Sequence, residues 1–443
     1  MDEMRSIRRL IGVGLVAAAG VFGLVNQTQA QSASSEVVVL EATGPVVPPL
    51  AGYIARGLAE ADMRNAEAVV LVLDTPGGSL GVTNGIVQDI QNSDVPVLVF
   101  VGPRGALAGS AGLLITLAGH ASAMAPGTAI GASSPVDATG GDLPSTIAEK
   151  QKEILSAQAR SLAERRGEAA VQIASDAVTE ARAVSASEAL DAGLIDFVAN
   201  DVSEVLIQAD GLTVDVNGRT RTLRTANARE IDIAMSRLEN LLMLLTNPNI
   251  VSILLSIGVL AIIVEIRTPG GWVSGALGVT SVGLALYGLG VLPVNWLGIV
   301  FIIMAFVLFF LELHATTHGA LAFAGAISLA AGTIVLFSQP EMAPFGRISI
   351  PLVIGQSVFI ALIFAFLLTF ALRAQKLKPT TGYEGLVGQT GRVTQTLDPV
   401  GMVQVWGERW KAESVDGEHI PAGREVEVVE AGKMRLKVRP VQR

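Results

Sequence analysis

The sequence predicts three parts in series: an α/β domain, a bundle of apolar helices that crosses a membrane, and a small all-β domain. Between residues 36 and 200, short β-branched runs alternate with amphipathic segments. Five apolar stretches follow, each near the ~20 residues that cross a bilayer. Short alternating runs broken by glycines occupy the C-terminal end. These patterns are typical of parallel strands covered by helices, of membrane helices and of a small β-barrel.

The composition supports a membrane protein. Half of the 443 residues are hydrophobic, 16% are charged and 47 are glycine, which favours closely packed membrane helices over an ordinary soluble core. The net charge of −9 gives no general attraction to nucleic acid, because phosphate binding needs clustered Lys and Arg. The chain has no Cys, so disulfides, thiol catalysis and Cys zinc sites are excluded. We expect no cofactor, no metal and no nucleic acid.

The first 30 residues have the layout of a secretory signal peptide. A basic start precedes an apolar stretch from Leu10 to Val25, and the small residue Ala30 marks the expected cleavage point. The alternative is an uncleaved anchor helix, although the apolar stretch is shorter than the ~20 residues that a span needs. In either case, the domain that follows is exported.

The exported domain, expected over residues 31–205, is predicted to be α/β. Its strands are nearly continuous apolar runs, as in parallel sheets covered on both faces, and lie at 36–40, 68–75 and 95–100. Apolar positions at helical spacing predict helices between them, at 49–65 and 80–93. In such a domain, ligands bind at the carboxyl ends of the strands.

Residues 206–248 are predicted to form a linker. It contains a hairpin around Asn217-Gly218, the strongest short hairpin signal, and an amphipathic helix from about Ala228 to Leu245. The membrane domain then covers residues 249–373 with five spans. The spans are expected at about 249–266, 272–290, 296–313, 319–337 and 351–372.

Positive charge orients the spans in the plasma (inner) membrane. Arg267 lies in one loop of the cytoplasmic set, and Arg373, Lys376 and Lys378 follow the last span, whereas the outer loops carry only Arg347. Because Lys and Arg favour the cytoplasmic side, the exported domain lies outside and the C-terminus inside.

Glu265 and Glu312 lie near the ends of the first and third spans. A carboxylate in a membrane is often functional, but at this depth we expect each to accept hydrogen bonds from a neighbouring helix end. His314 and His318 follow Glu312 at metal-like spacing, but the sequence around them favours a loop, so we expect no metal site there.

The C-terminal segment, residues 382–443, is predicted to be a small β-barrel, with about five short strands in some sixty residues. Trp406, Trp410 and nearby basic residues resemble a nucleic-acid-binding surface of the five-stranded OB type. Many acidic residues surround them, however, which favours a packing or docking module instead.

One serine lies where a nucleophile could be activated. DTPGGSL, residues 74–80, ends the second predicted strand, and its glycines allow backbone N–H groups to point into the crevice. Ser110 precedes an apolar helix and so has its hydroxyl at the positive end of the helix dipole. An oxyanion there would be stabilised by the amide of Ala111 and one from Gly77 or Gly78. The alternative is that Ser110 only caps the helix.

Several motifs in order resemble a known family. VLDTPGGSL, GALAGSAGLLITLAG, AMAPGTAIGASSP, RSLAERRG and VSASEALDAGLIDFVA resemble the exported ClpP-class serine peptidase domain of NfeD proteins, the membrane partners of stomatin- and flotillin-like proteins. VEIRTPGGW and LELH repeat the glutamate and Pro-Gly pattern of the family's membrane part, and the tail resembles its OB-fold domain. The resemblance implies a ClpP/crotonase-like fold, homo-oligomers, Ser110 as nucleophile, and Gly77, Gly78 and Ala111 as oxyanion donors.

Four residues are candidates for a role as, or beside, the general base: His120, Lys150, Lys152 and Arg160. His120 lies ten residues after Ser110, about 15 Å along a helix, and is expected to be a helix-end residue. Peptidases of the family use a lysine on a later helix, and Lys150 and Lys152 are the lysines between residues 31 and 240. Arg160 stands where the best-known family pattern has lysine, and arginine stays protonated.

The resemblance therefore implies Lys150 as base, with Lys152 next. The alternative is that both lysines are solvated, with Arg160 binding a substrate carboxylate or covering its helix. We expect a membrane-bound serine endopeptidase that cleaves apolar segments of membrane-associated proteins and acts with a stomatin- or flotillin-like partner in the lipid bilayer. The alternative function is a weak or inactive membrane scaffold that organises such a partner.

Overall fold

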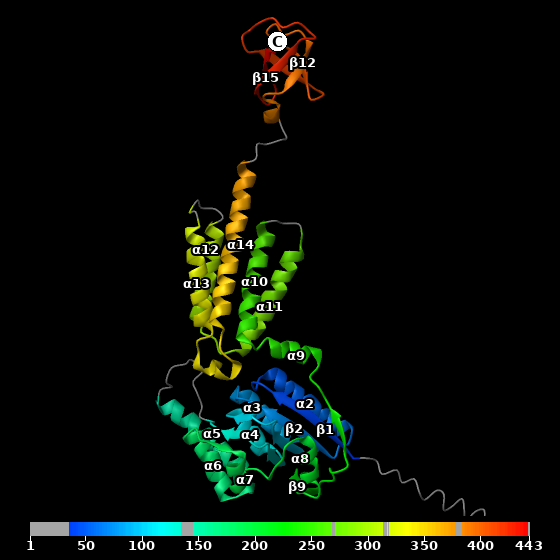
Figure 1. Ribbon diagram of the computed structural model, residues 1–443, viewed down its shortest axis with the longest axis vertical. Helices are drawn as coiled ribbons and strands as arrows, with labels where there is room; N and C mark the ends of the chain where they lie inside the picture. The colour runs from blue at the N-terminus through cyan, green and yellow to red at the C-terminus, as the bar shows by residue number, and fades with distance from the viewer. Residues whose placement is uncertain are drawn as a thin grey trace, which may run out of the picture. The chain divides into compact units, whose positions relative to one another are not determined.

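The computed structural model describes residues 35–133, 145–267, 271–312, 317, 319–376 and 383–441 (Figure 1). The expected signal peptide, His314 and His318 lie outside the described residues. Within these residues, the three predicted parts are an α/β domain, an apolar helical domain and a β-barrel, which confirms the expected fold class.

The α/β domain is built on a six-stranded sheet with the order β11-β1-β2-β3-β5-β8 and all neighbouring pairs parallel. Its central strands are almost fully buried, which explains their continuous apolar runs. The strands are β1 (Glu36–Thr43), β2 (Ala68–Asp74), β3 (Val97–Val101), β5 (Ala121–Met124), β8 (Phe197–Val198) and β11 (Arg229–Asp232).

Two hydrophobic cores cover the two faces of this sheet, and alternate strand residues such as Val37 and Val38 enter different cores. The larger core is covered by α2 (Pro48–Met63), α3 (Leu80–Gln91), α4 (Ala111–Ala118), α5 (Ser145–Ala163) and α6 (Glu168–Thr179). The smaller core is covered by α8 (Val202–Ala209) and the hairpin of β9 (Thr213–Val216) and β10 (Arg219–Thr222).

A second, three-stranded sheet lies beside α4, with the order β4-β6-β7. Its strands are β4 (Leu107–Gly109), β6 (Ala129–Gly131) and β7 (Ala183–Ser185), and the short helices η1 (Glu164–Arg166) and α7 (Ala186–Asp191) follow α5 and β7. Because β4 ends one residue before Ser110, this sheet fixes the approach of the chain to the start of α4.

The domain extends beyond the predicted boundary at residue 205. Val214 and Val216 of the hairpin are buried in the smaller core, so the hairpin is part of the domain and not of a linker. The predicted helix from Ala228 to Leu245 is instead β11 followed by the short helix α9 (Arg237–Leu244). Ile231 and Ile233 pack on the larger core with the period of two that a strand requires, and β11 pairs with the edge of β1.

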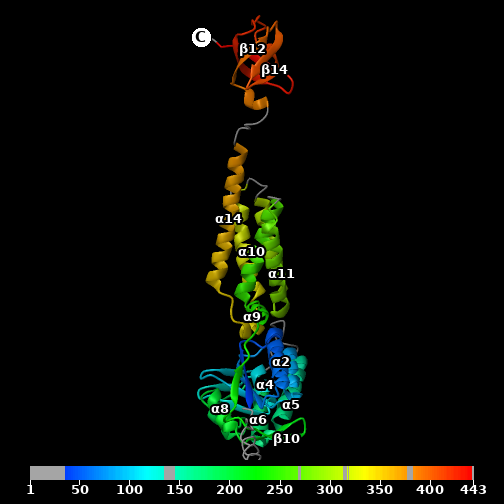
Figure 2. The same cartoon turned by 90° about the vertical axis from the view of Figure 1, so that its right-hand side faces the viewer.

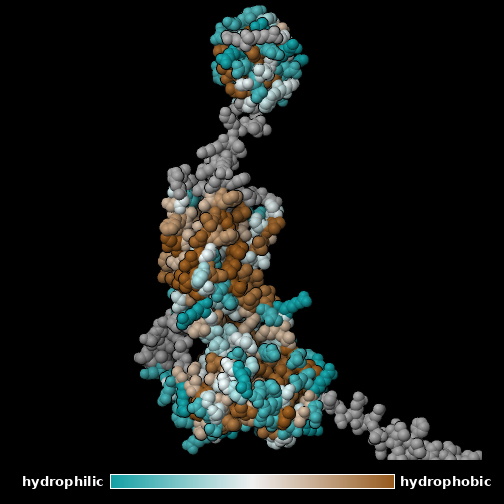
Figure 3. Space-filling model, viewed as in Figure 1, coloured by the Kyte–Doolittle hydropathy of each residue, from teal (hydrophilic) through white to brown (hydrophobic). Residues whose placement is uncertain are grey.

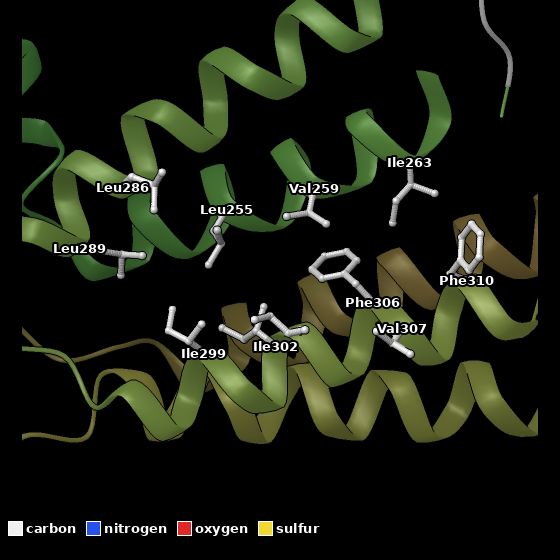
Figure 4. A pocket seen from close by; sticks show the side chains of 11 residues that line it. Leu255, Val259, Ile263, Leu286, Leu289, Ile299, Ile302, Phe306, Val307 and Phe310 are labelled. Atoms are coloured by element: carbon white, nitrogen blue, oxygen red, sulfur yellow. The ribbon is translucent and has the colours of Figure 1, made fainter. Parts of the chain in front are cut away.

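All five predicted apolar stretches form helices, whose surface is largely apolar in Figure 3. The helices are α10 (Pro248–Arg267), α11 (Val273–Val291), α12 (Trp296–Glu312), α13 (Ala320–Leu336) and α14 (Ile350–Lys376), all labelled in Figure 1; Figure 2 shows α10, α11 and α14 from a second side. Residues 248–266 and 273–291 are long and apolar enough to cross a membrane, and the other three helices have shorter apolar segments within the described residues. A cavity of about 410 Å³ between α10, α11 and α12 is lined only by Leu, Ile, Val and Phe (Figure 4).

Both membrane glutamates bind the start of the next helix, as predicted. Glu265 accepts hydrogen bonds from the N–H groups of Trp272 and Gly275, before and within the first turn of α11. Glu312 accepts from the N–H groups of Leu321 and Ala322 in the first turn of α13. In both cases, the glutamate precedes its last N–H donor by ten residues: Glu265 binds Gly275, and Glu312 binds Ala322.

The C-terminal domain is a closed five-stranded barrel with the order β12-β13-β14-β16-β15. Only β14 and β16 pair in parallel, and the barrel encloses its own core, as in the expected OB fold. Trp410 packs against this core, whereas Trp406 is exposed in the turn between β13 and β14. The strands are β12 (Thr390–Gln395), β13 (Val400–Val405), β14 (Glu408–Ser414), β15 (Glu425–Ala431) and β16 (Leu436–Pro440).

Candidate active site

Ser110 joins β4 to α4 in a backbone conformation that side-chain-bearing residues rarely adopt. Its φ is 49° and its ψ is −105°, and such conformations cost about 1–3 kcal/mol. The conformation is held by hydrogen bonds from the Ser110 N–H to the Gly131 carbonyl (2.8 Å) and from the Ser133 hydroxyl to the Ser110 carbonyl (2.9 Å). The Ser110 side chain makes no capping hydrogen bond to α4, so the hydroxyl is not used as a helix cap.

The glycine turn between β2 and α3 passes directly beside this serine. Gly77 has a φ of +120°, and a Cβ placed there would lie 2.9 Å from Ser110 Cβ and 3.4 Å from its Oγ. Gly78 is held against Val46: the Val46 N–H donates to the Gly77 carbonyl (2.8 Å), and a Cβ at 78 would lie 2.3 Å from the Val46 carbonyl oxygen. Glycine is therefore required at both positions for the turn to approach the hydroxyl.

The three expected oxyanion donors differ in what they already bind. The Gly77 N–H donates to the Thr75 hydroxyl (3.1 Å), so this amide is engaged within the turn. Among the described residues, the N–H groups of Gly78 and Ala111 have no hydrogen-bond acceptor. One of these amides belongs to the glycine turn and the other to the first residue of α4.

Helix α4 adds to the positive potential at the serine. All eight of its residues are buried, so little water screens the partial positive charge at its N-terminus. A negative charge that develops beside Ser110 would therefore be stabilised by the helix as well as by free amides.

Neither candidate lysine contacts Ser110 within the part of the chain that the structure describes. Both are on α5, where Lys150 is exposed and Lys152 is partly exposed. Helix α5 itself is well anchored: Leu155 and Ala159 enter the core, and the Gln158 side chain donates to Asn84 on α3 (2.9 Å).

Arg160 is bound along its own helix. Its guanidinium donates to the Ser156 hydroxyl (3.0 Å) and to the Glu153 carboxylate (3.2 Å). Ser156 is buried and its hydroxyl lies 3.2 Å from that of Ser175 on α6. Arg160 therefore covers the surface of α5 close to α6, one of the alternatives expected from the sequence.

His120 follows the end of α4, as predicted, and acts as a hydrogen-bond acceptor. Its Nδ1 accepts from the Val97 N–H (3.0 Å). Burial, and secondarily the charge of Arg165, lowers the pKa of His120 to about 4. The imidazole is therefore neutral near neutral pH, and one nitrogen is already occupied in the fold.

Sequence reasoning missed the residues that shape the glycine turn. The Thr75 hydroxyl also lies 3.2 Å from the Gly77 carbonyl, and the Asp74 carboxylate accepts from the Leu107 N–H (2.9 Å), which joins β2 to β4. Both residues belong to the motif DTPGGSL, and a polar pair followed by Pro76 and two glycines is the signal that could have indicated this role.

Comparison with known proteins places all three domains in one family. Family models match the NfeD1b N-terminal domain over residues 36–233, the NfeD integral membrane domain over residues 249–370, and the NfeD-like C-terminal, partner-binding domain over residues 383–440. The membrane-bound protease PH1510 of Pyrococcus horikoshii is 36% identical over 416 residues, which are 92% of this chain and 93% of that protein.

Two further relatives are similar over a domain or the full length. The membrane protein NfeD1b of Bacillus subtilis is 26% identical over 457 residues, which cover 98% of each chain. The structure of the 1510-N membrane protease specific for a stomatin homolog, from Pyrococcus horikoshii, is 34% identical and matches 48% of this chain and 100% of that one, with a TM-score of 0.42.

Proposed function

Because the chain belongs to the NfeD family, and a relative that matches 92% of it is a membrane-bound protease, we propose that it is a membrane-bound serine endopeptidase of the ClpP class. The observation that carries the proposal is the geometry at Ser110. Ser110 has a strained backbone conformation and lies at a helix N-terminus beside a glycine turn, and its hydroxyl makes no capping hydrogen bond to that helix. This arrangement suits attack on a carbonyl whose oxygen becomes negative.

In the proposed reaction, Ser110 Oγ attacks the scissile carbonyl carbon and its proton passes to the base. The amides of Gly78 and Ala111 bind the oxyanion, while Gly77 keeps the turn close to the hydroxyl. The base returns the proton to the leaving amine as the C–N bond breaks. Water then attacks the acyl-enzyme while the same base takes its proton, and the base passes this proton to Ser110 Oγ as the ester bond breaks.

We propose Lys150 as this base, with Lys152 as the second choice. Lys150 is exposed on α5 and does not contact Ser110, so its role requires the start of α5 to move toward the serine when a peptide binds. Arg160 is occupied by Ser156 and Glu153, which supports a structural role for it and not one in proton transfer.

The substrates that we propose are apolar segments of membrane-associated proteins, cleaved on the extracytoplasmic side by a homo-oligomer. The C-terminal barrel, on the cytoplasmic side, would bind a stomatin- or flotillin-like membrane protein. The family model that matches this barrel describes it as a partner-binding domain, which supports a docking role.

A scaffold without proteolysis is the second candidate. It is favoured because, among the described residues, Ser110 has no hydrogen bond to either lysine and Lys150 is exposed. The full chain in detergent or nanodiscs distinguishes the two. The measurements are labelling by a serine-reactive phosphonate and cleavage of apolar peptides by wild type, Ser110→Ala, Lys150→Ala, Lys152→Ala and Arg160→Ala. If the protein is a peptidase with Lys150 as base, wild type cleaves the peptides, Ser110→Ala and Lys150→Ala do not, and Arg160→Ala retains cleavage. Labelling of wild type without turnover in any protein would favour the scaffold.

A further inference from the structure

The short helix α9 connects the peptidase domain to the first membrane helix. It begins with a capping box, in which the Ser236 hydroxyl accepts from the Glu239 N–H and the Glu239 carboxylate accepts from the Ser236 N–H. It ends at Leu244, and α10 begins at Pro248. Four residue steps span at most about 14 Å even when fully extended. The end of α9 therefore lies close to the point where the chain enters the membrane.

One face of α9 is fixed to the peptidase domain. The Glu239 carboxylate accepts two hydrogen bonds from Arg56 of α2, from Nε (2.9 Å) and Nη2 (2.7 Å). Arg56 also donates to the Ala234 carbonyl (3.0 Å) and lies over the Tyr53 ring, at 5.6 Å from its centroid. The Tyr53 hydroxyl donates to the Ile233 carbonyl (2.7 Å). The segment that leads into α9, and the helix itself, are thus attached to α2.

The opposite face of α9 is apolar and exposed. Leu238, Leu241 and Leu244 recur every three residues, so they lie along one side of the helix. Their exposed fractions are 63%, 42% and 51%. Arg237 lies beside them at the start of the helix and is also exposed. Exposed leucines beside a cation are the composition of a helix that lies in a membrane interface.

We propose that α9 is an interfacial helix, with its three leucines at the boundary between the headgroups and the acyl chains of the bilayer that α10 enters. The bilayer is the occupant that the chain itself indicates, because the membrane domain begins at residue 249 and α9 cannot lie far from it. Through Arg56 and Glu239, the helix holds the α2 side of the peptidase domain at the membrane surface. The proposal goes beyond proteolysis and holds whether or not Ser110 is a nucleophile.

The absence of Cys from the sequence allows a direct test on the full chain in nanodiscs of phosphatidylcholine and phosphatidylglycerol. A Leu241→Cys variant is labelled with an environment-sensitive fluorophore, and Leu238→Cys provides a second position on the same face. Ile207→Cys is the matched control, because Ile207 is an apolar residue of α8 that is 64% exposed.

We expect blue-shifted emission at both α9 positions and quenching by spin-labelled lipids several-fold stronger than at residue 207. Quenching by aqueous iodide but not by lipid would overturn the proposal. Energy transfer between labelled copies without quenching by lipid would also overturn it, because the face would then be covered by a second copy of the chain. Peptide cleavage measured on the same samples reports separately on the proposed peptidase activity.

Discussion

Replacing Gly77 by alanine tests how the site is assembled. The new Cβ would lie 2.9 Å from Ser110 Cβ, closer than real Cβ atoms approach a neighbour, and alanine would have to adopt a φ of +120°. The conformational cost alone is about 1–3 kcal/mol, which lowers the Tm of a domain of this size by roughly 2–12 °C. The clash is relieved only if the turn moves away from the serine, and the Gly78 amide moves with it.

The loss of one oxyanion donor typically lowers kcat by about 10²–10³, so Gly77→Ala is expected to lose at least two orders of magnitude in turnover of an apolar peptide. The control is Gly81→Ala, four residues later in α3, where a new Cβ has no contact closer than 4.0 Å. Turnover and thermal unfolding are measured on the full chain. If Gly77→Ala cleaved peptide as fast as Gly81→Ala, the assignment of the glycine turn to the oxyanion site would be wrong.

Two further predictions concern groups around the site. Thr75→Val removes the acceptor of the buried Gly77 N–H, which should cost about 1–3 kcal/mol and lower the Tm, whereas Thr75→Ser should retain most of the stability; equal Tm values for the two variants would contradict this. The folded-state pKa of His120 is about 4, below its ordinary 6.5, so the stability that neutral His120 contributes is fully present above pH 6.5 and is lost as pH falls through 4. This loss is at most about 3 kcal/mol. His120→Gln should therefore flatten the dependence of unfolding on pH over this range, and an unchanged dependence would contradict the prediction.

The strands of the central sheet and the position of Ser110 directly before α4 could be predicted because both depend on local patterns. An apolar run marks each buried strand, and a small-residue turn before an apolar helix marks the serine. The role of Thr75 was not predictable in the same way, because it depends on how one side chain folds back onto Gly77. Nor could the base be assigned, since the spacing along α5 does not determine where the start of that helix lies relative to Ser110.

The boundary of the first domain was misjudged for a related reason. Ile231, Ile233 and Met235 pack on the core with a period of two, but four residues of strand are too short to be distinguished from the start of an amphipathic helix. These residues form a strand because they pair with the edge of β1, and this edge exists only once the sheet is assembled.

Glu265 and Glu312, which accept hydrogen bonds from the starts of α11 and α13, have a consequence for biosynthesis. Hydrocarbon offers no partner to the amides that begin a helix, and each helical pair supplies its own acceptor ten residues upstream. The amides that bind each glutamate therefore need no acceptor from a segment that is synthesised later.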